Sequence, residues 1–359
     1  MSISPRALAC LLTSAQLIAP SCASAQSGAA LRIAGVVVSQ AAQSPLGHSM
    51  ITLQPVGREI FSDDQGRFVF VGVPPGRYRM RVAHLGFAPK DITLDVSADS
   101  TVTRVRIELD AVQVRLATVR VTAAATCTLP GRPDPVKERD LVIVLDQLEQ
   151  NARQYRLLAD SFPYSYQEER TTFAVRSDSM ILARRIDTLL LRSDNPTWTY
   201  RAGHVLSDNT MQGLMHLPLL SDFASDDFIK SHCFRYGGMA QTLEGPAVRI
   251  DFRADDRLKA PDVNGSILLD ASSYQIRSAV LQLSRIPDPM SRFVSSVRAT
   301  TLFREVEPSV LVISHVHGVT TLYPPRLDII ATASTVDDQT LLRFGFVGRS
   351  PGQSSQRPH

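Results

Sequence analysis

The sequence carries almost no net charge of one sign. Its 38 lysine and arginine residues nearly balance 35 aspartate and glutamate residues, which leaves a formal net charge of +3. Nucleic-acid binding depends on a concentrated basic surface, because contacts to phosphates supply most of the affinity. An excess this small and scattered predicts no nucleic-acid partner.

Long apolar runs are missing after the first residues. Residues 26–359 contain no apolar run of about 18 residues, which is the length that a membrane-spanning helix needs, so we expect no transmembrane span in the mature chain. At the N-terminus, Arg6 precedes the apolar run ALACLLTSAQLIA, and Ala23 and Ala25 give the small-x-small pattern of a signal peptidase site. We predict a signal peptide over residues 1–25, cleavage between Ala25 and Gln26, secretion across the inner membrane, and a location in the periplasm or at the outer membrane or cell surface.

Cysteine is scarce. Of the four cysteines, Cys10 and Cys22 lie in the predicted signal peptide. Cys22 also permits a lipoprotein reading, although Ala19 stands where a leucine usually precedes a lipidated cysteine. The remaining Cys127 and Cys233 would face an oxidising compartment, which predicts a disulfide between them. Two unpaired buried thiols are the alternative.

Common catalytic and cofactor motifs are missing as well. None of the eight histidines belongs to a His-Glu-x-x-His motif or has a glutamate three residues further on, as zinc peptidases require. The phosphate-binding motif Gly-x-x-x-x-Gly-Lys and the redox or zinc motif Cys-x-x-Cys are also missing. We therefore expect no catalytic residue, no metal site and no cofactor, and no enzyme activity; a hydrolase with an unrecognised site is the least favoured reading.

Apolar and polar residues alternate through most of residues 31–109. In residues 63–82, DDQGRFVFVGVPPGRYRMRV, Phe68 and Phe70 share one face with the later Tyr78. A period of two between turn signals predicts short antiparallel strands whose apolar faces form the core of a sandwich. The turn signals are SPLGH at 44–48, DDQG at 63–66, VPPG at 73–76 and HLGF at 84–87.

Residues 31–96 resemble the carboxypeptidase regulatory-like domain, a prealbumin-like seven-stranded β-sandwich that also stands at the front of TonB-dependent receptors. The matching features are Gly35 and Val37, Pro45-Leu46, Asp64 with Gly66, Phe68 and Phe70, Pro75-Gly76-Tyr78, and Gly86-Phe87. Asp63-Asp64 departs from the Thr-Asp that family members often carry. The resemblance implies a fold and brings no catalytic residue with it.

The domain boundaries follow from these patterns. We expect the sandwich over residues 26–112, a closing strand and linker over 113–139, an antiparallel β domain with one helix over 140–347, and a disordered tail over 348–359. The proline-rich and charged stretch TLPGRPDPVKERD reads as the linker.

In the second domain, Asp140 is expected to cap an amphipathic helix over 141–158. The rest predicts long antiparallel strands that form a curved sheet or half-barrel against this helix. The stretch GSILLDASSYQIRSAVLQLS has the rhythm of periplasmic lipoprotein-carrier sheets and resembles them weakly. The expected elements are strands at 164–175, 179–192, 197–202, 247–253, 265–270, 273–285, 294–306, 310–323, 326–335 and 340–347, and a short helical piece near 217–230.

Two groups of side chains suggest binding surfaces. On the sandwich, Arg77, Arg79, Arg81, Arg104 and Arg106 would form a basic face for an anionic polymer or lipid headgroups if their strands are neighbours; a solvated face balanced by nearby acids is the alternative. In the second domain, Trp198 and Tyr200 could stack on a sugar, although alternating aromatic residues are more often part of a core.

The closest approach to a metal site is SHVHG, because His315 and His317 lie on one face of a predicted strand. Glu305 and Glu307 share a face of the preceding strand. A hairpin turn near Pro308 would put Glu305 about three residues from His315, so the four side chains are not expected to converge.

These features favour a secreted, non-catalytic cell-envelope protein whose sandwich is a binding or spacing module for a glycan, lipid or protein partner. A periplasmic carrier or sensor of an apolar ligand, held between the curved sheet and the helix, is the alternative. A peptidase-associated protein is less favoured.

Overall fold

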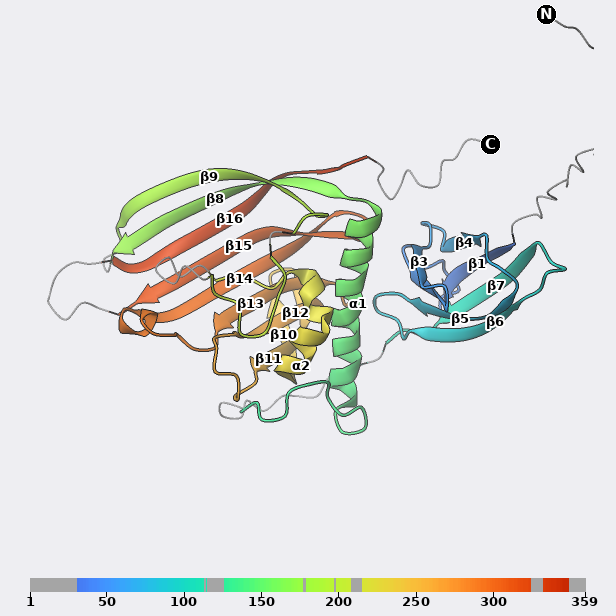
Figure 1. The fold of residues 1–359 in the computed structure, drawn as a ribbon, viewed down its shortest axis with the longest axis horizontal. Coiled ribbons are helices and arrows are strands. Elements are labelled where there is room, and N and C mark those ends of the chain that lie inside the picture. The colour runs from blue at the N-terminus through green and yellow to red at the C-terminus, as the bar shows by residue number, and fades with distance from the viewer. Residues whose placement is uncertain are drawn as a thin grey trace, which may run out of the picture.

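The structure is a computed structural model that describes residues 31–112, 114, 126–176, 179–196, 198–207, 215–323 and 332–348. The predicted signal peptide with its cleavage site, Cys22, most of the expected closing strand and the tail beyond Gly348 lie outside these residues. A long helix, α1 (Arg139–Ser161), separates a small β domain from a larger curved sheet (Figure 1). No helix in the described parts of the chain is long and apolar enough to cross a membrane.

The small domain is a sandwich of seven strands, as predicted. One sheet has the order β4-β1-β7 and the other the order β3-β2-β5-β6. Strands β1 and β7 pair in parallel, whereas the other pairs within residues 32–109 are antiparallel. The strands are β1 (Arg32–Ser39), β2 (Met50–Gln54), β3 (Arg58–Phe61), β4 (Arg67–Val71), β5 (Gly76–Ala83), β6 (Lys90–Val96) and β7 (Val102–Leu109).

The alternating residues of both sheets meet in one core. Phe70, Ile51 and Met80 are completely buried between the layers. A Cβ atom on Gly35 would lie 2.6 Å from the Phe68 ring, so only glycine lets that ring lie against β1. Each large apolar side chain buried here contributes about 1.5–3 kcal/mol.

The predicted turn at residues 63–66 forms as its residues suggest. Asp63 Oδ1 accepts hydrogen bonds from the backbone N–H groups of Gln65 (2.9 Å) and Arg67 (2.8 Å). Gly66 has a φ of +70°, and a Cβ atom there would lie 2.4 Å from the Val37 carbonyl oxygen. The turn therefore needs glycine for both its backbone angle and its packing.

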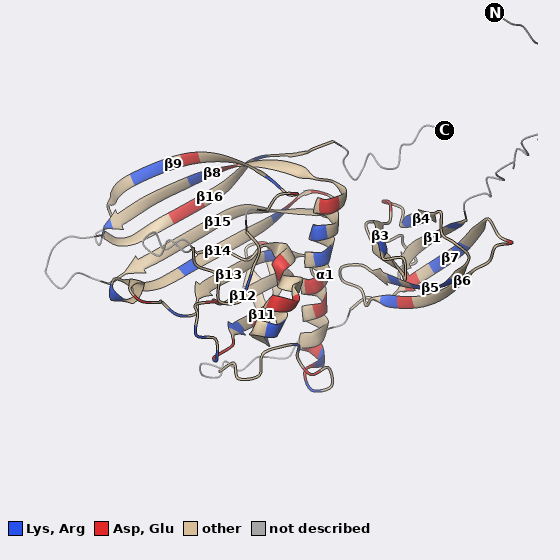
Figure 2. Ribbon diagram, in the orientation of Figure 1, with Lys and Arg blue, Asp and Glu red and all other residues tan. Residues whose placement is uncertain are grey.

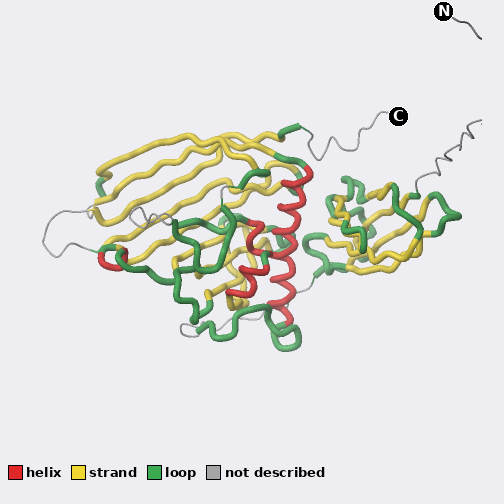
Figure 3. Tube along the Cα trace, viewed as in Figure 1, coloured by secondary structure: helices red, strands yellow, loops and turns green. Residues whose placement is uncertain are grey.

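The second domain is a single nine-stranded sheet with the order β10-β11-β12-β13-β14-β15-β16-β8-β9, and each neighbouring pair is antiparallel. The predicted curved sheet with one packed helix is therefore confirmed (Figure 3). The strands are β8 (Tyr164–Arg176), β9 (Ile181–Arg192), β10 (His232–Thr242), β11 (Gly245–Ala254), β12 (Val263–Asp270), β13 (Ile276–Leu283), β14 (Val294–Glu307), β15 (Val310–Leu322) and β16 (Thr332–Phe346). Short helical pieces are η1 (Leu220–Ala224), α2 (Asp226–Ser231) and η2 (Met290–Arg292).

Several local predictions differ from the structure. Helix α1 begins at Arg139 with Glu138 at its N-cap, so Asp140 lies in the first turn and does not cap the helix. Residues 198–202 form no strand, and β10 was not predicted. The expected break between 335 and 340 is also wrong, because β16 runs through Asp337 and Asp338 without interruption. Residues 324–331 of the expected strand 326–335 lie outside the described residues.

The main core fills the helix side of β10 to β14. From α1, Val144, Leu145 and Leu148 are completely buried. They belong to one cluster with Phe223 of η1, Phe228 of α2 and inward-facing residues of the sheet, which include Ile250, Ile267 and Leu281. The helices α1 and α2 and the helical turn η1 therefore cover the concave side of this half of the sheet.

A disulfide links Cys127 to Cys233, as predicted, with the two Cα atoms 5.5 Å apart. It joins the segment before α1 to the first residues of the edge strand β10. Asp256 reinforces the link, because its Oδ2 accepts a hydrogen bond from Cys127 N (2.7 Å) and its backbone N donates to Cys127 O (2.9 Å).

Replacing both cysteines by serine should lower the free energy of unfolding by about 4 kcal/mol, because the bridge closes a long loop in the unfolded chain. Denaturant titration of the wild type and of the Cys127→Ser, Cys233→Ser variant measures this difference. Equal midpoints and slopes for the two proteins would show that the bridge adds nothing to stability.

Two amide side chains of α1 connect the helix to both domains. Gln147 Oε1 accepts a hydrogen bond from Gly86 N (2.8 Å), and its Nε2 donates to Phe87 O (3.2 Å), so it binds the loop between β5 and β6. One turn later, Asn151 Nδ2 donates to Tyr274 O (2.8 Å) and Oδ1 accepts from Ile276 N (3.0 Å), at the turn before β13. Both amide side chains are buried.

Asn151→Ala should destabilise the second domain by about 2–4 kcal/mol, because it leaves the buried Ile276 N–H and Tyr274 C=O without partners. Thermal and denaturant unfolding measure the loss. The exposed Arg156→Ala on the same helix is the control and should change stability by less than about 0.5 kcal/mol. A similar small effect for both variants would contradict the role of Asn151.

Candidate functional site

The five arginines of the predicted basic face lie on two different sheets. Arg77, Arg79 and Arg81 alternate with the core residues of β5, whereas Arg104 and Arg106 alternate with those of β7. Strand β5 belongs to the four-stranded sheet and β7 to the three-stranded sheet. Outward-facing residues of the two layers of a sandwich point in opposite directions, so the five side chains do not form one patch. Figure 2 shows the basic and acidic positions along the strands of both sheets.

Acidic neighbours pair with several of these arginines. Arg79 and Arg81 both contact Asp91, at 3.2 Å and 3.0 Å, and Arg106 contacts Glu108 at 3.3 Å. In the described parts of the chain, no carboxylate lies within ion-pair distance of Arg104. The same holds for Arg77, so Arg77 and Arg104 are the two members of the predicted set without an ion pair to a described carboxylate, and of these two only Arg104 lines the cleft described next.

A cleft of about 850 Å³ lies between the three-stranded sheet and the end of α1. Its sandwich wall includes Val36 on β1, Val69 on β4 and Arg104 on β7, and its helix wall includes Leu158 and Phe162. Sites between two domains and of about 300–1,000 Å³ are typical of small-molecule binding. The cleft was not predicted, because the sequence does not show which sheet faces the helix.

The cleft combines an apolar surface with charges at its edges. Val69 is 48% exposed although it lies in a strand. Arg67 lies 2.9 Å from Asp63 and His48 lies 2.9 Å from Asp64, so both carboxylates already have partners within the sandwich. Glu59 also lines the cleft and accepts a hydrogen bond from Thr52 Oγ1 (3.0 Å), so a carboxylate as well as Arg104 borders the apolar surface.

A second, smaller cavity of about 160 Å³ lies where the β5–β6 loop meets α1, and His84 lines it together with Gln147. His84 Nδ1 lies 3.2 Å from Ser49 Oγ. Burial, and to a lesser extent the neighbouring His48, lowers the pKa of His84 from 6.5 to about 4. The folded protein therefore keeps this ring neutral at the contact between the domains.

His84 makes stability depend on pH. Between pH 6.5 and about 4 the unfolded chain binds a proton at this residue and the folded chain does not, so its contribution is complete above pH 6.5 and is lost as the pH falls to about 4. Compared with His84→Gln, the wild type should lose up to about 3 kcal/mol more over this range.

Denaturant unfolding at a series of pH values measures that difference. The comparison cancels the opposite slope of Asp222, whose pKa burial raises to about 6. The exposed His204→Gln is the control and should follow the wild type. Parallel pH profiles for the wild type and His84→Gln would contradict the assignment.

The helix-facing side of β16 and β8 is apolar near α1, where Tyr164, Leu341 and Phe344 pack with Ala159, and carries charged side chains further along the strands. The ladder places Arg170 opposite Gln339, which lies opposite the buried Val316. Arg170 Nε lies 2.8 Å from Asp337 Oδ2, and Gln339 Nε2 donates to Asp337 Oδ1 at 3.1 Å. Burial raises the pKa of the nearby Glu168 carboxyl. These paired charges stand where a carrier of an apolar ligand would need apolar side chains.

Trp198 and Tyr200 pack into the protein. Tyr200 is 3% exposed and donates a hydrogen bond to Asp262 Oδ2 at 2.8 Å. Trp198 stacks on His216 with ring centroids 5.2 Å apart and packs against the main core. Their rings therefore fit the core reading and not an open platform for a sugar.

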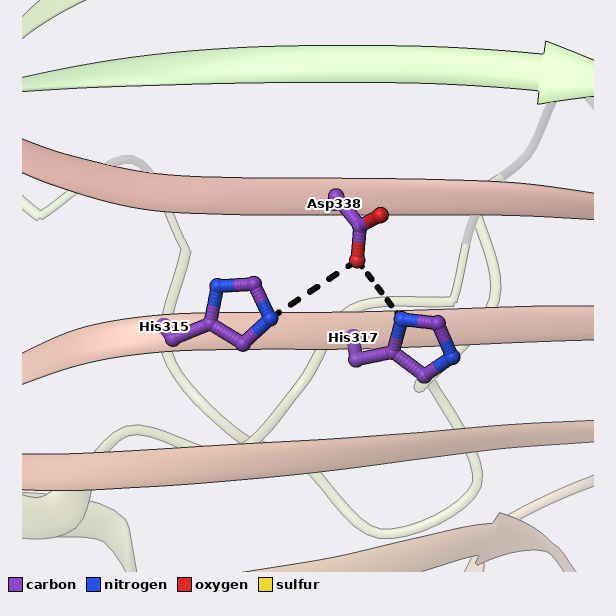
Figure 4. A group of neighbouring side chains, drawn as sticks. All are labelled: His315, His317 and Asp338. Carbon is purple, nitrogen blue, oxygen red and sulfur yellow. Dashed lines mark hydrogen bonds and ion pairs between the residues drawn. The ribbon is translucent and has the colours of Figure 1, made fainter.

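The two histidines of SHVHG meet an aspartate that was not predicted to be near them. His317 Nδ1 lies 2.6 Å and His315 Nε2 lies 3.7 Å from the same oxygen, Asp338 Oδ1 (Figure 4). The three side chains come from neighbouring strands, because His317 pairs with Asp338 in the β15–β16 ladder. They lie on the face opposite the buried Val316, so the group is at the outer surface of the sheet.

Glu305 takes no part in this group. It pairs with Leu311 near the β14–β15 turn and accepts a hydrogen bond from Ser309 N. Glu307 is exposed beside the same turn. The expectation that these two glutamates stay away from the histidines agrees with the ladder. The approach of Asp338 was missed because residues 336–339 were left between two expected strands, 326–335 and 340–347.

Comparison with known families identifies the small domain. The family model of the carboxypeptidase regulatory-like domain matches residues 32–110, so the resemblance seen in the sequence is confirmed there. A comparison with curated proteins finds no match to the chain.

Solved structures resemble the chain at low identity. A LolA superfamily protein from Nitrosomonas europaea is 9% identical, with 59% of this chain and 97% of that chain covered and a TM-score of 0.30. A putative outer membrane lipoprotein-sorting protein domain from Vibrio parahaemolyticus is 9% identical, with 57% and 97% covered and a TM-score of 0.29. A DUF1329 family protein from Desulfovibrio piger is 9% identical, with 58% and 96% covered and a TM-score of 0.32. Similarity at this level supports no conclusion about fold or function.

Proposed function

We propose that the protein is a secreted, non-catalytic binding protein of the cell envelope, located in the periplasm or at the outer membrane. Its ligand is an envelope amphiphile with an anionic group, bound in the cleft between the sandwich and α1. The observation that carries this proposal is the cleft of about 850 Å³ with walls from both domains. The side-chain amide of Gln147 binds the β5–β6 loop to α1 and so holds the sandwich wall of the cleft against its helix wall.

The apolar wall supplies affinity and Arg104 supplies selectivity for charge. Ala34, Val36 and Val69 alternate with core residues of β1 and β4, so their side chains face outward. Burying such side chains against a lipid or sugar ring is favourable at about 25 cal/mol per Å² of apolar surface. A guanidinium at the edge of this wall can bind a carboxylate or phosphate with two hydrogen bonds.

The packing favours this cleft over an apolar cavity inside the curved sheet. The side chains of α1, η1 and α2 fill the concave side of β10 to β14, and the open part of the sheet carries the Arg170–Asp337 pair. An apolar ligand in the curved sheet would have to displace this core or lie on those charges, and both are costly.

Charge reversal at Arg104 should weaken binding to native outer-membrane vesicles. In a co-sedimentation titration, Arg104→Glu and Val69→Asp are expected to raise the apparent Kd by about tenfold, which corresponds to about 1.4 kcal/mol. The binding of the wild type should also weaken as salt increases, because part of the attraction is between exposed charges.

Arg77→Glu is the matched control. It makes the same change of charge on the other sheet, away from the cleft residues, and should leave the Kd within about twofold of the wild type. An equal loss in Arg77→Glu would point to unspecific charge attraction. Failure of the wild type to bind any envelope fraction would overturn the proposed function.

A further inference from the structure

We propose that His315, His317 and Asp338 form a binding site for a divalent transition metal ion, with zinc as the expected ion. The three potential ligand atoms, one from each side chain, lie within 4.8 Å of one another. All three belong to the outer face of β15 and β16, outside the cleft and outside the core. This site is independent of the proposed ligand cleft.

The separations suit a metal with short bonds. Zinc binds imidazole nitrogen and carboxylate oxygen at about 2.0–2.2 Å, so two ligands of a tetrahedral site are about 3.3–3.5 Å apart. The Asp338 Oδ1 distances of 2.6 Å to His317 Nδ1 and 3.7 Å to His315 Nε2 lie on either side of that value. The three atoms thus lie close to the spacing that one tetrahedral centre requires.

The strands fix the positions of the three ligands. His315 and His317 are two residues apart on β15, so both rings leave the same face of the sheet. The ladder puts Asp338 directly opposite His317 and Thr340 directly opposite His315. A site on two paired strands needs little ordering when it binds an ion, because the backbone is already held by hydrogen bonds.

A partner orients one of the histidines. His315 Nδ1 lies 3.1 Å from Thr340 Oγ1. When Nδ1–H donates to this hydroxyl, Nε2 keeps the lone pair that a metal requires and points it toward Asp338. On the same face, Glu169 of β8 pairs with Thr340 and adds a negative charge close to the site.

The donor set indicates the class of ion. Two imidazoles and one carboxylate suit zinc and related first-row ions better than calcium or magnesium, which prefer oxygen ligands alone. The side chains of His315, His317 and Asp338 are 35%, 48% and 28% exposed, so an ion can reach them from solvent. A fourth position remains for water or for an anionic group of a partner.

Isothermal titration of the protein with zinc chloride tests the proposal. One zinc ion per chain is expected. His317→Ala and Asp338→Asn should each weaken binding at least tenfold, and Thr340→Val should weaken it by about tenfold through the loss of the bond that orients His315. Cobalt(II) should give visible absorption bands that zinc displaces and that His317→Ala abolishes.

His204→Ala and Glu307→Gln are matched controls, because each removes an exposed group of the same type that lies outside the site. Both should bind zinc like the wild type, and circular dichroism should show that every variant remains folded. The proposal fails if the wild type does not bind zinc, if His317→Ala and Asp338→Asn bind it as well as the wild type, or if His204→Ala loses binding equally. In those cases the contacts of His315 and His317 with Asp338 serve only to hold the neighbouring strands together.

Discussion

Two buried amide side chains of α1, Gln147 and Asn151, fix the positions of the two domains against the helix. Gln147 satisfies a backbone N–H and a C=O of the sandwich loop, and Asn151, one turn further on, does the same for the curved sheet. A buried polar group without a hydrogen-bond partner is costly in free energy. Such contacts therefore favour one arrangement of helix and domains and destabilise arrangements in which the hydrogen bonds are lost. The helix thereby sets the distance between the two walls of the cleft, one from the sandwich and one from the end of α1.

The sheet of the second domain uses its two faces differently. On the helix side, apolar residues of β10 to β14 build the main core, and Asp337 is neutralised by Arg170. One residue along β16, Asp338 points to the other side and meets two histidines. Because consecutive residues of a strand lie on opposite faces of the sheet, the two aspartates have different roles. Asp337 stabilises the open half of the sheet, and Asp338 can bind an ion.

The sandwich and the general form of the second domain were predictable, because period-two alternation and the turn residues describe local structure directly. Strand β10 was missed since Gly237 and Gly238 interrupt its pattern; the structure accommodates them with a bulge between Tyr236 and Gly238. Asp337 and Asp338 fell between two expected strands, and aspartate is depleted in strands. The pairing of β5 and β7 with different sheets, and the contact of Gln147 with the sandwich, depend on tertiary arrangement that local patterns do not contain.

Hydrogen exchange at the Gly86 amide tests the coupling of the two domains most directly. This N–H donates to the side chain of Gln147, across the boundary between sandwich and helix. With residue-resolved detection, the exchange should be slowed to the level of the core strands in the wild type and should become fast in Gln147→Ala, while the core amide of Met80 stays protected in both. Fast exchange at Gly86 in the wild type would show that the domains move independently and that the cleft between them has no fixed shape.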